Sequence, residues 1–297
     1  MDRWCCEKQE FMLVYQYMHN GSLDKHLFEY SFLAWETRYR IVGDIAAGLH
    51  YIHHELDNVV IHRDIKSSNI LLDHSLRGCL GDFGLAQVVA RGRRSSSSTG
   101  TAGMGSASAA GTEGYIAPEY EASGKATVAS DVYAFGVVIL EIVTRREVFD
   151  DSQPSGSTHL VDWVRNEFHD KGKPLLEAVD RDLTGGGRWR RHDAAEAERL
   201  LLLGLACTST DPSDRPITRD VLKIIDKTLP PPVVPPHRNI PRGASTRPTP
   251  VGGLGLPSIS VHDADDASIT ITRSRFRRSI AFLCQGHMTF RSEEAQV

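Results

Sequence analysis

The chain has 297 residues, of which 40% are hydrophobic, and its formal net charge is −4 at pH 7. This apolar fraction is sufficient for a substantial core, and the slightly acidic balance excludes a general nucleic-acid-binding protein. The five cysteines are scattered without metal-ligand spacing, and the most apolar window, residues 133–143, is far shorter than the roughly 20 residues of a membrane-spanning helix. We therefore expect a chain without a membrane span.

The first part of the chain alternates short strands with helices. Residues 11–18 (FMLVYQYM) are aromatic and β-branched, which predicts a buried strand, and the following HNGSL predicts a turn into a short helix ending near residue 28. Apolar residues recur at helical spacing over 35–54, which predicts a long amphipathic helix. Short apolar runs predict three strands with small hairpins between them, at 59–61, 70–72 and 79–81.

The second part is predominantly helical. Residues 91–112 are a low-complexity run of Arg, Ser, Gly, Thr and Ala, too polar to pack, which predicts a mobile loop. The prolines of 229–236 end the globular part, and we expect a disordered tail after them. Helices joined by a few short strands indicate an α+β fold class. Helical periodicity is found in four segments, at 128–144, 159–168, 194–207 and 217–228.

Residues 62–69 (HRDIKSSN) carry groups that phosphoryl transfer from ATP requires. Such a reaction needs a metal anchor, a group that orients the attacking hydroxyl, and positive charge beside the moving phosphoryl group. Asp64 can orient the hydroxyl or accept its proton, and Lys66 can neutralise charge on the γ-phosphoryl group. Asn69 can ligate Mg²⁺, so this one segment offers all three functions.

Asp82 of the DFG sequence can bridge Mg²⁺ to the phosphates, while Gly84 lets the backbone bend next to the metal. The strands predicted at 70–72 and 79–81 would form a hairpin that delivers Asn69 and Asp82 to the same metal site. A metal hydrolase that uses Asp and His groups is a weaker alternative. It lacks zinc-like spacing, and an Asp–Asn pair suits Mg²⁺ with a nucleotide.

Four segments in this order, HRDIKSSN, DFG, GTEGYIAPEY and SDVYAFG, resemble the motifs of eukaryotic protein kinases. The segments LVYQYMHNGSLDKHLF and AGTEGYIAPEY narrow the resemblance to plant receptor-like serine/threonine kinases, and the opening WCCEKQEFMLVYQYMHNGSLDKHLF looks most like the lectin-domain receptor kinases. The resemblance covers roughly residues 4–229. It implies transfer of the ATP γ-phosphoryl group to protein Ser or Thr, in receptor-like kinase signalling.

The resemblance also implies a protein-kinase-like fold in three parts. Residues 1–18 would be a remnant of the small N-lobe together with the hinge. Residues 19–229 would be the helical C-lobe, with the catalytic loop and the activation segment, and residues 230–297 a Pro-rich and then basic disordered tail. The fold would thus be mostly the C-lobe, with a remnant of the N-lobe sheet.

The same resemblance supplies an ATP site. Tyr15 would be the gatekeeper of the adenine pocket, and Gln16, Tyr17 and Met18 would be the hinge whose backbone groups pair with adenine. Leu71 would be the apolar floor under the adenine ring. The implied cofactors are ATP and Mg²⁺.

Five further residues would hold the active arrangement together if the resemblance applies. His62 and Phe83 would stack in the regulatory spine, anchored by Asp131. Glu119 would form a buried ion pair with Arg215 that ties the activation segment to the helical lobe.

The activation segment would supply substrate and regulatory residues. Thr112 would hydrogen-bond Asp64 and Lys66, a combination that fits serine/threonine specificity. Arg63 is the feature of kinases switched by activation-loop phosphorylation, because its charge can bind a phosphate group. The candidate phosphorylation residues are Ser95, Ser96, Ser97, Ser98, Thr99 and Thr101.

No GxGxxG sequence precedes the catalytic loop in this chain, and the lysine of the third small-lobe strand and the glutamate of helix C are absent as well. The resemblance therefore implies a kinase domain cut at its N-terminus, which we expect to be inactive on its own. Three interpretations stay open. The chain is a fragment of a full receptor kinase, a short product acting as a non-catalytic interaction module or decoy, or a kinase completed by another chain.

The expected partners are ATP and proteins with Ser or Thr to phosphorylate, with a full-length receptor kinase as a further candidate. We expect no nucleic acid and no membrane span. The full-length family would act at the cytoplasmic side of the plasma membrane, and this chain as written would be soluble and cytoplasmic.

Overall fold

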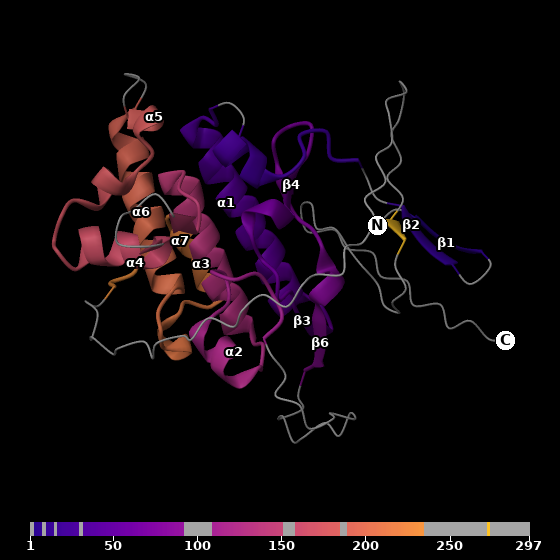
Figure 1. Ribbon diagram of the computed structural model, residues 1–297. Coiled ribbons are helices and arrows are strands. Elements are labelled where there is room, and N and C mark those ends of the chain that lie inside the picture. Colours follow the sequence, from indigo (N-terminus) through magenta and orange to yellow (C-terminus); the bar gives the residue numbers. More distant parts are fainter. Residues whose placement is uncertain are drawn as a thin grey trace.

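The computed structural model describes residues 3–7, 10–14, 17–29, 32–91, 109–150, 158–184, 189–234 and 272–273. Its helices gather into one body, and the strands form four small sheets (Figure 1). Helices with a few short strands confirm the predicted α+β class. None of the described helices combines the length and the apolarity that crossing a bilayer requires.

The helical body is built around α3 (Val128–Thr144). Nearly all side chains of α3 are buried, because its residues are apolar on almost every face and other helices surround it (Figure 1). α6 (Arg191–Cys207) packs along α3, and α7 (Thr218–Ile225) packs against both α6 and α1 (Trp35–His50). α1 continues into a π-helical turn at Tyr51–Glu55. The predicted long helices are therefore confirmed, with ends that differ by a few residues.

Two glycines allow α3 and α6 to approach closely. A Cβ atom added to Gly136 would lie 2.6 Å from Cβ of Cys207 and 2.8 Å from Cγ2 of Thr208. A Cβ atom added to Gly204 would lie 2.7 Å from Cδ2 of Leu140. Since real Cβ contacts are longer than these, a larger residue at Gly136 must push the two helices apart, and one at Gly204 must displace the Leu140 side chain.

We expect Gly136→Ala to lower the free energy of unfolding by about 1–3 kcal/mol, since overpacking strains the contact between α3 and α6. Gly43→Ala in α1 is the matched control, because the nearest atom to its added Cβ would be 3.8 Å away. That control should be neutral or gain up to about 1 kcal/mol from the better helix propensity of alanine. Urea denaturation followed by circular dichroism measures both variants. Equal midpoints for the two would contradict the close contact.

The hairpin predicted between the metal ligands is present. β4 (Ile70–Leu72) pairs antiparallel with β5 (Gly78–Leu80). β3 (Asn58–Ile61) pairs instead with β6 (Gln87–Ala90), a strand that the sequence reasoning missed. The sequence QVVA is short and shows no apolar alternation, so it does not indicate a strand. All four residues are exposed in the structure.

A separate hairpin is formed by β1 (Arg3–Glu7) and β2 (Glu10–Val14), and β9 (Thr272–Arg273) adds to the other edge of β2. The strand predicted over 11–18 is right for residues 11–14, whereas Tyr17 and Met18 are not in a strand. Of the predicted disordered tail, β9 and residues 230–234 are described, and the rest lies outside the described residues.

The remaining elements are short. α2 (Pro118–Ser123) and α5 (Arg181–Thr184) escape sequence prediction, since a helix of one or two turns shows no clear period. α4 (Leu160–Val164) continues as a π-helical turn to His169, which matches the helix predicted over 159–168. β7 (Phe149–Asp150) pairs with β8 (Thr158–His159) between α3 and α4. Further helical turns lie at Lys25–Glu29, Ser67–Asn69, Phe83–Leu85, Leu175–Ala178 and Pro212–Asp214.

Candidate active site

The catalytic loop, residues 62–69, is fixed by a buried carboxylate in the first turn of α3. Asp131 Oδ2 accepts the backbone N–H of His62 at 2.7 Å, and its Oδ1 accepts that of Arg63 at 2.9 Å. Nε2 of His53 lies 2.9 Å from the same carboxylate. The N-terminal end of a helix favours negative charge, which suits Asp131 at this position. The loop is thereby anchored to the central helix.

The ring of His62 joins the catalytic loop to the DFG segment. Its Nε2 donates to the carbonyl oxygen of Gly81 at 2.9 Å, while its Nδ1 accepts the backbone N–H of Asp64 at 3.3 Å. Only an uncharged imidazole can make both bonds, and burial lowers the pKa of His62 accordingly. The rings of His62 and Phe83 lie 4.6 Å apart between centroids, as the resemblance to the kinases implied.

Asp64 lies at the centre of a small polar cluster. Its Oδ1 accepts the hydroxyl of Thr112 at 2.8 Å, and its Oδ2 lies 3.1 Å from Nζ of Lys66. Lys66 Nζ also donates to the hydroxyl oxygen of Thr112 at 2.8 Å. Asn69 donates from Nδ2 to Asp64 Oδ2 at 3.0 Å, which leaves its Oδ1 available for a cation. The structure thus brings together the four residues expected at the centre of the site.

Asp82 is delivered beside Asn69 by the β4–β5 hairpin. The backbone N–H of Gly81 donates to the carbonyl oxygen of Asn69 at 2.8 Å, immediately beyond the pairing of the two strands. The backbone of Asp82 is left-handed (φ 54°), and its exposed carboxylate accepts the N–H of Gly84 at 3.2 Å. A Cβ atom on Gly84 would lie 3.0 Å from that carboxylate, so a larger residue would require the Asp82 side chain to shift slightly. Amide and carboxylate oxygens are ligand types that Mg²⁺ accepts in proteins.

The residues expected to bind adenine are only partly described. Tyr15 and Gln16 lie outside the described residues, whereas Tyr17 is 47% exposed and Met18 is buried. The segment after them runs alongside β4, since the backbone N–H of Asn20 donates to the Leu72 carbonyl and Ser22 forms a bridge with Leu71. Leu71 is half-buried there.

The substrate loop, residues 109–117, packs against the catalytic loop. A Cβ atom on Gly111 would lie 2.8 Å from the carbonyl oxygen of Arg63. Nε of Arg63 donates to the hydroxyl of Tyr120 in α2 at 3.2 Å, and that hydroxyl bonds to the backbone of Ala110. Nε of Arg63 is therefore occupied by the chain itself. The six candidate phosphorylation residues, Ser95, Ser96, Ser97, Ser98, Thr99 and Thr101, lie outside the described residues.

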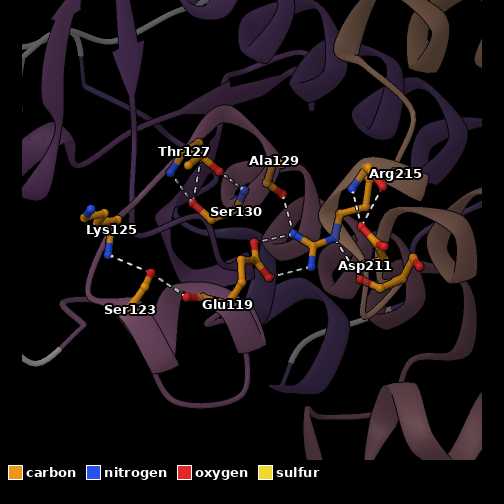
Figure 2. Close-up of polar contacts among 10 residues, drawn as sticks. Glu119, Ser123, Lys125, Thr127, Ala129, Ser130, Asp211 and Arg215 are labelled. Atoms are coloured by element: carbon orange, nitrogen blue, oxygen red, sulfur yellow. Dashed lines mark hydrogen bonds and ion pairs between the residues drawn. The ribbon is translucent and has the colours of Figure 1, made fainter. Parts of the chain in front are cut away.

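Glu119 and Arg215 form a bidentate pair that joins α2 to the segment before α7 (Figure 2). Both bonds between the guanidinium and the carboxylate measure 2.7 Å. Arg215 also donates to the carbonyls of Ser209 and Ala129, and its guanidinium lies 5.0 Å from the ring centroid of Tyr133. Because the guanidinium bonds to both carboxylate oxygens and to two carbonyls, this partly buried pair is well satisfied.

A reciprocal cap starts α3 next to this pair (Figure 2). The hydroxyl of Thr127 accepts the N–H of Ser130 at 3.2 Å, and the hydroxyl of Ser130 accepts the N–H of Thr127 at 3.0 Å. Both bonds satisfy backbone donors at the start of the helix, where the regular i→i−4 bonds have not yet begun. The cap fixes where α3 begins, and hence the position of Asp131 under the catalytic loop.

Four residues at the edge of the site are absent from the set expected from the sequence: Glu141, Ser67, Tyr115 and His53. Glu141 of α3 accepts hydrogen bonds from Ser67 and from Tyr115. The available signal is an acidic residue in the otherwise apolar run of α3. His53 is buried against Asp131.

Comparison with known proteins agrees with this geometry. Residues 1–224 match the family described as "Protein kinase domain". The chain therefore belongs to the protein kinase family.

Its relatives place it more narrowly. It is 42% identical over 227 residues to the L-type lectin-domain containing receptor kinase S.1 of Arabidopsis thaliana, a match that covers 76% of this chain and 32% of that protein. It is 43% identical over 238 residues to the probable L-type lectin-domain containing receptor kinase S.7 of the same plant, covering 78% and 33%. The resemblance to plant receptor-like kinases is thus confirmed, and the chain spans about a third of the length of these relatives.

Proposed function

We propose that this chain provides the catalytic C-lobe of a plant receptor-like serine/threonine kinase, which transfers the γ-phosphoryl group of ATP to protein hydroxyl groups. The observation that carries the proposal is the cluster in which Asp64 contacts Thr112, Lys66 and Asn69. Asp82 follows β5, the strand that pairs with β4. A metal-ligand pair, a hydroxyl-orienting carboxylate and a lysine are what this chemistry needs.

Each residue has one role in the proposed reaction. Asp64 orients the substrate hydroxyl and accepts its proton, and Lys66 stabilises negative charge on the transferred group. Thr112 holds both of these side chains through one hydroxyl and, with Lys66, selects Ser or Thr as acceptor. The positioning of these groups, rather than covalent chemistry, supplies the rate enhancement.

Asn69 and Asp82 would hold Mg²⁺, which when bound neutralises charge on the phosphates. Tyr15 would border the adenine pocket, the backbone of Gln16–Met18 would bond to adenine, and Leu71 would lie under the ring. The stacked rings of His62 and Phe83 support this arrangement, since they fix the DFG segment relative to the catalytic loop.

Arg63 is proposed as the receptor of a phosphate on the activation segment. Nε of Arg63 donates to the hydroxyl of Tyr120 in the structure, and a phosphate group would compete with Tyr120 for that donor. In the cell, the family would act at the cytoplasmic side of the plasma membrane on other proteins.

A second candidate function is a non-catalytic interaction module. The observation that favours it is that the helical body has a core of its own, built around α3. Such a module would bind a full-length receptor kinase or its substrate.

One experiment separates the two functions. The purified chain and its Asp64→Ala variant are incubated with radiolabelled ATP, Mg²⁺ and a basic protein substrate. The same two proteins are also prepared with the small-lobe segment of a related plant kinase, including its Gly-rich loop and lysine, added at the N-terminus. This longer form is called the extended chain. We expect no label above the Asp64→Ala control from the chain alone, and label on Ser or Thr from the extended chain that disappears with Asp64→Ala. A folded extended chain that binds Mg·ATP without transferring phosphate would favour the interaction module.

A further inference from the structure

Glu141 joins three parts of the site from within the central helix. It is 1% exposed. Its Oε1 accepts the hydroxyl of Tyr115, in the substrate loop, at 2.8 Å, and the hydroxyl of Ser67, in the catalytic loop, at 3.2 Å. The two hydroxyl oxygens lie 3.3 Å from each other. One carboxyl group of α3 therefore contacts both loops that must be aligned for phosphoryl transfer.

The surroundings of Glu141 disfavour a negative charge. Its second oxygen, Oε2, is buried and has no hydrogen-bond partner among the described residues. A buried oxygen of Asp24 is likewise without a partner among the described residues, and the leading charge effects on Glu141 come from the acids Asp24 and Glu147. Arg38, the cation of α1 that reaches α3, bonds to Asp180 and to the Ile142 carbonyl instead. No ion pair to Glu141 is formed within the part of the chain that the structure describes, so an ionised carboxylate here would be costly.

Burial raises the pKa of Glu141 to about 8, despite the hydrogen bonds from Tyr115 and Ser67 that act in the opposite direction. Burial and the neighbouring Glu141 also raise the pKa of Tyr115, so the phenol stays a hydrogen-bond donor. At neutral pH the favoured state is thus an uncharged carboxyl group that accepts two hydroxyl hydrogens on one oxygen.

We propose that Glu141 is a positioning residue for phosphoryl transfer, which as an uncharged carboxyl group ties the substrate loop to the catalytic loop through Tyr115 and Ser67. The inference rests on the proposed function. Ser67 directly follows Lys66, and the backbone N–H of Tyr115 closes a turn onto the carbonyl of Thr112 at 3.1 Å. Movement of either hydroxyl would therefore shift the contact between Lys66 and Thr112 that borders Asp64.

The protonation state is tested by stability, without any activity. The pKa of Glu141 in the folded chain lies above the ordinary 4.5 of the unfolded one, so its contribution to stability is full below about pH 4.5 and is lost as pH rises to about 8. We expect the urea midpoint of the wild type to fall relative to that of Glu141→Gln over this range. Exposed Glu121→Gln should keep the wild-type dependence. A constant difference between wild type and Glu141→Gln, or a Glu141→Gln variant less stable than wild type at pH 7, would overturn the proposal.

The positioning role is tested in the same chain by hydrogen–deuterium exchange of the substrate loop. Glu141→Ala removes both hydrogen bonds and should speed amide exchange over residues 111–117. Glu141→Gln keeps an acceptor oxygen, so the amides of these residues should exchange as slowly as in the wild type. Exchange that is unchanged in Glu141→Ala would contradict the role. In the extended chain we expect kcat to fall on the order of 10²-fold with Glu141→Ala and to recover with Glu141→Gln. An extended chain inactive with Glu141 in place would count against the proposed function alone, since the stability and exchange results still decide the inference.

Discussion

Replacing Asp64 with asparagine in the extended chain is expected to lower kcat by about 10²- to 10⁴-fold, which is the usual contribution of a positioned general base. The physical reason is that an amide cannot accept the proton of the substrate hydroxyl. KM for ATP should change little, because the proposed contacts to ATP and Mg²⁺ come from Asn69, Asp82 and the hinge rather than from Asp64. The measurement is steady-state transfer of radiolabelled phosphate to a protein substrate over a range of ATP concentrations.

The matched control for this prediction is Asp220→Asn. Asp220 is an exposed carboxylate of α7 whose ion-pair distance to Lys223 is 3.8 Å, so its loss should leave kcat unchanged. A thermal melt of each variant shows whether it is folded. If folded Asp64→Asn kept more than about a tenth of the wild-type kcat, Asp64 would not be the base, and orientation by Thr112 and Lys66 would have to account for the reaction.

Replacing Arg38 with alanine should lower the free energy of unfolding by about 3–5 kcal/mol, the usual cost of removing one partner from a buried ion pair. Arg38 is 1% exposed and donates to three acceptors: Asp180 Oδ2 at 2.6 Å, the Ile142 carbonyl at 2.9 Å and the Leu33 carbonyl at 3.0 Å. Alanine would leave the Asp180 carboxylate buried without a cation. Burial lowers the pKa of Arg38, and the Asp180 carboxylate opposes that shift. The negative charge of Asp180 therefore stabilises the buried guanidinium cation.

Urea denaturation of the chain itself measures this loss, which should correspond to a fall in melting temperature of roughly 10 °C. Arg40→Ala is the matched control on the same helix, since Arg40 makes one exposed hydrogen bond, to the Ser75 carbonyl at 3.1 Å. That variant should stay within about 0.5 kcal/mol of the wild type. The double variant Arg38→Met with Asp180→Leu should be more stable than Arg38→Ala alone, because it leaves no unpaired charge. A loss below 1 kcal/mol for Arg38→Ala would show that solvent or another donor replaces the guanidinium.

The sequence by itself determined the parts of this protein that depend on neighbours in the chain. HRDIKSSN and DFG, joined by two short apolar runs, were sufficient to predict that a hairpin brings Asn69 and Asp82 together, because strand pairing over so short a connection leaves few alternatives. The helix over 128–144 followed from helical periodicity in the sequence. The membership of the kinase family rested on the same local motifs.

Only the tertiary structure decided what depends on burial and on distant partners. Arg38 and Asp180 are 142 positions apart, and the sequence around neither residue indicates that the two form an ion pair. Glu141 stood in the sequence as one acid in an apolar helix, and its uncharged state arises because packing removes water and places Tyr115 and Ser67 on one of its oxygens. The free energy of a charge depends on its surroundings in space. A sequence motif therefore identifies which groups can react, and the packed fold decides which of them are charged and how they are held.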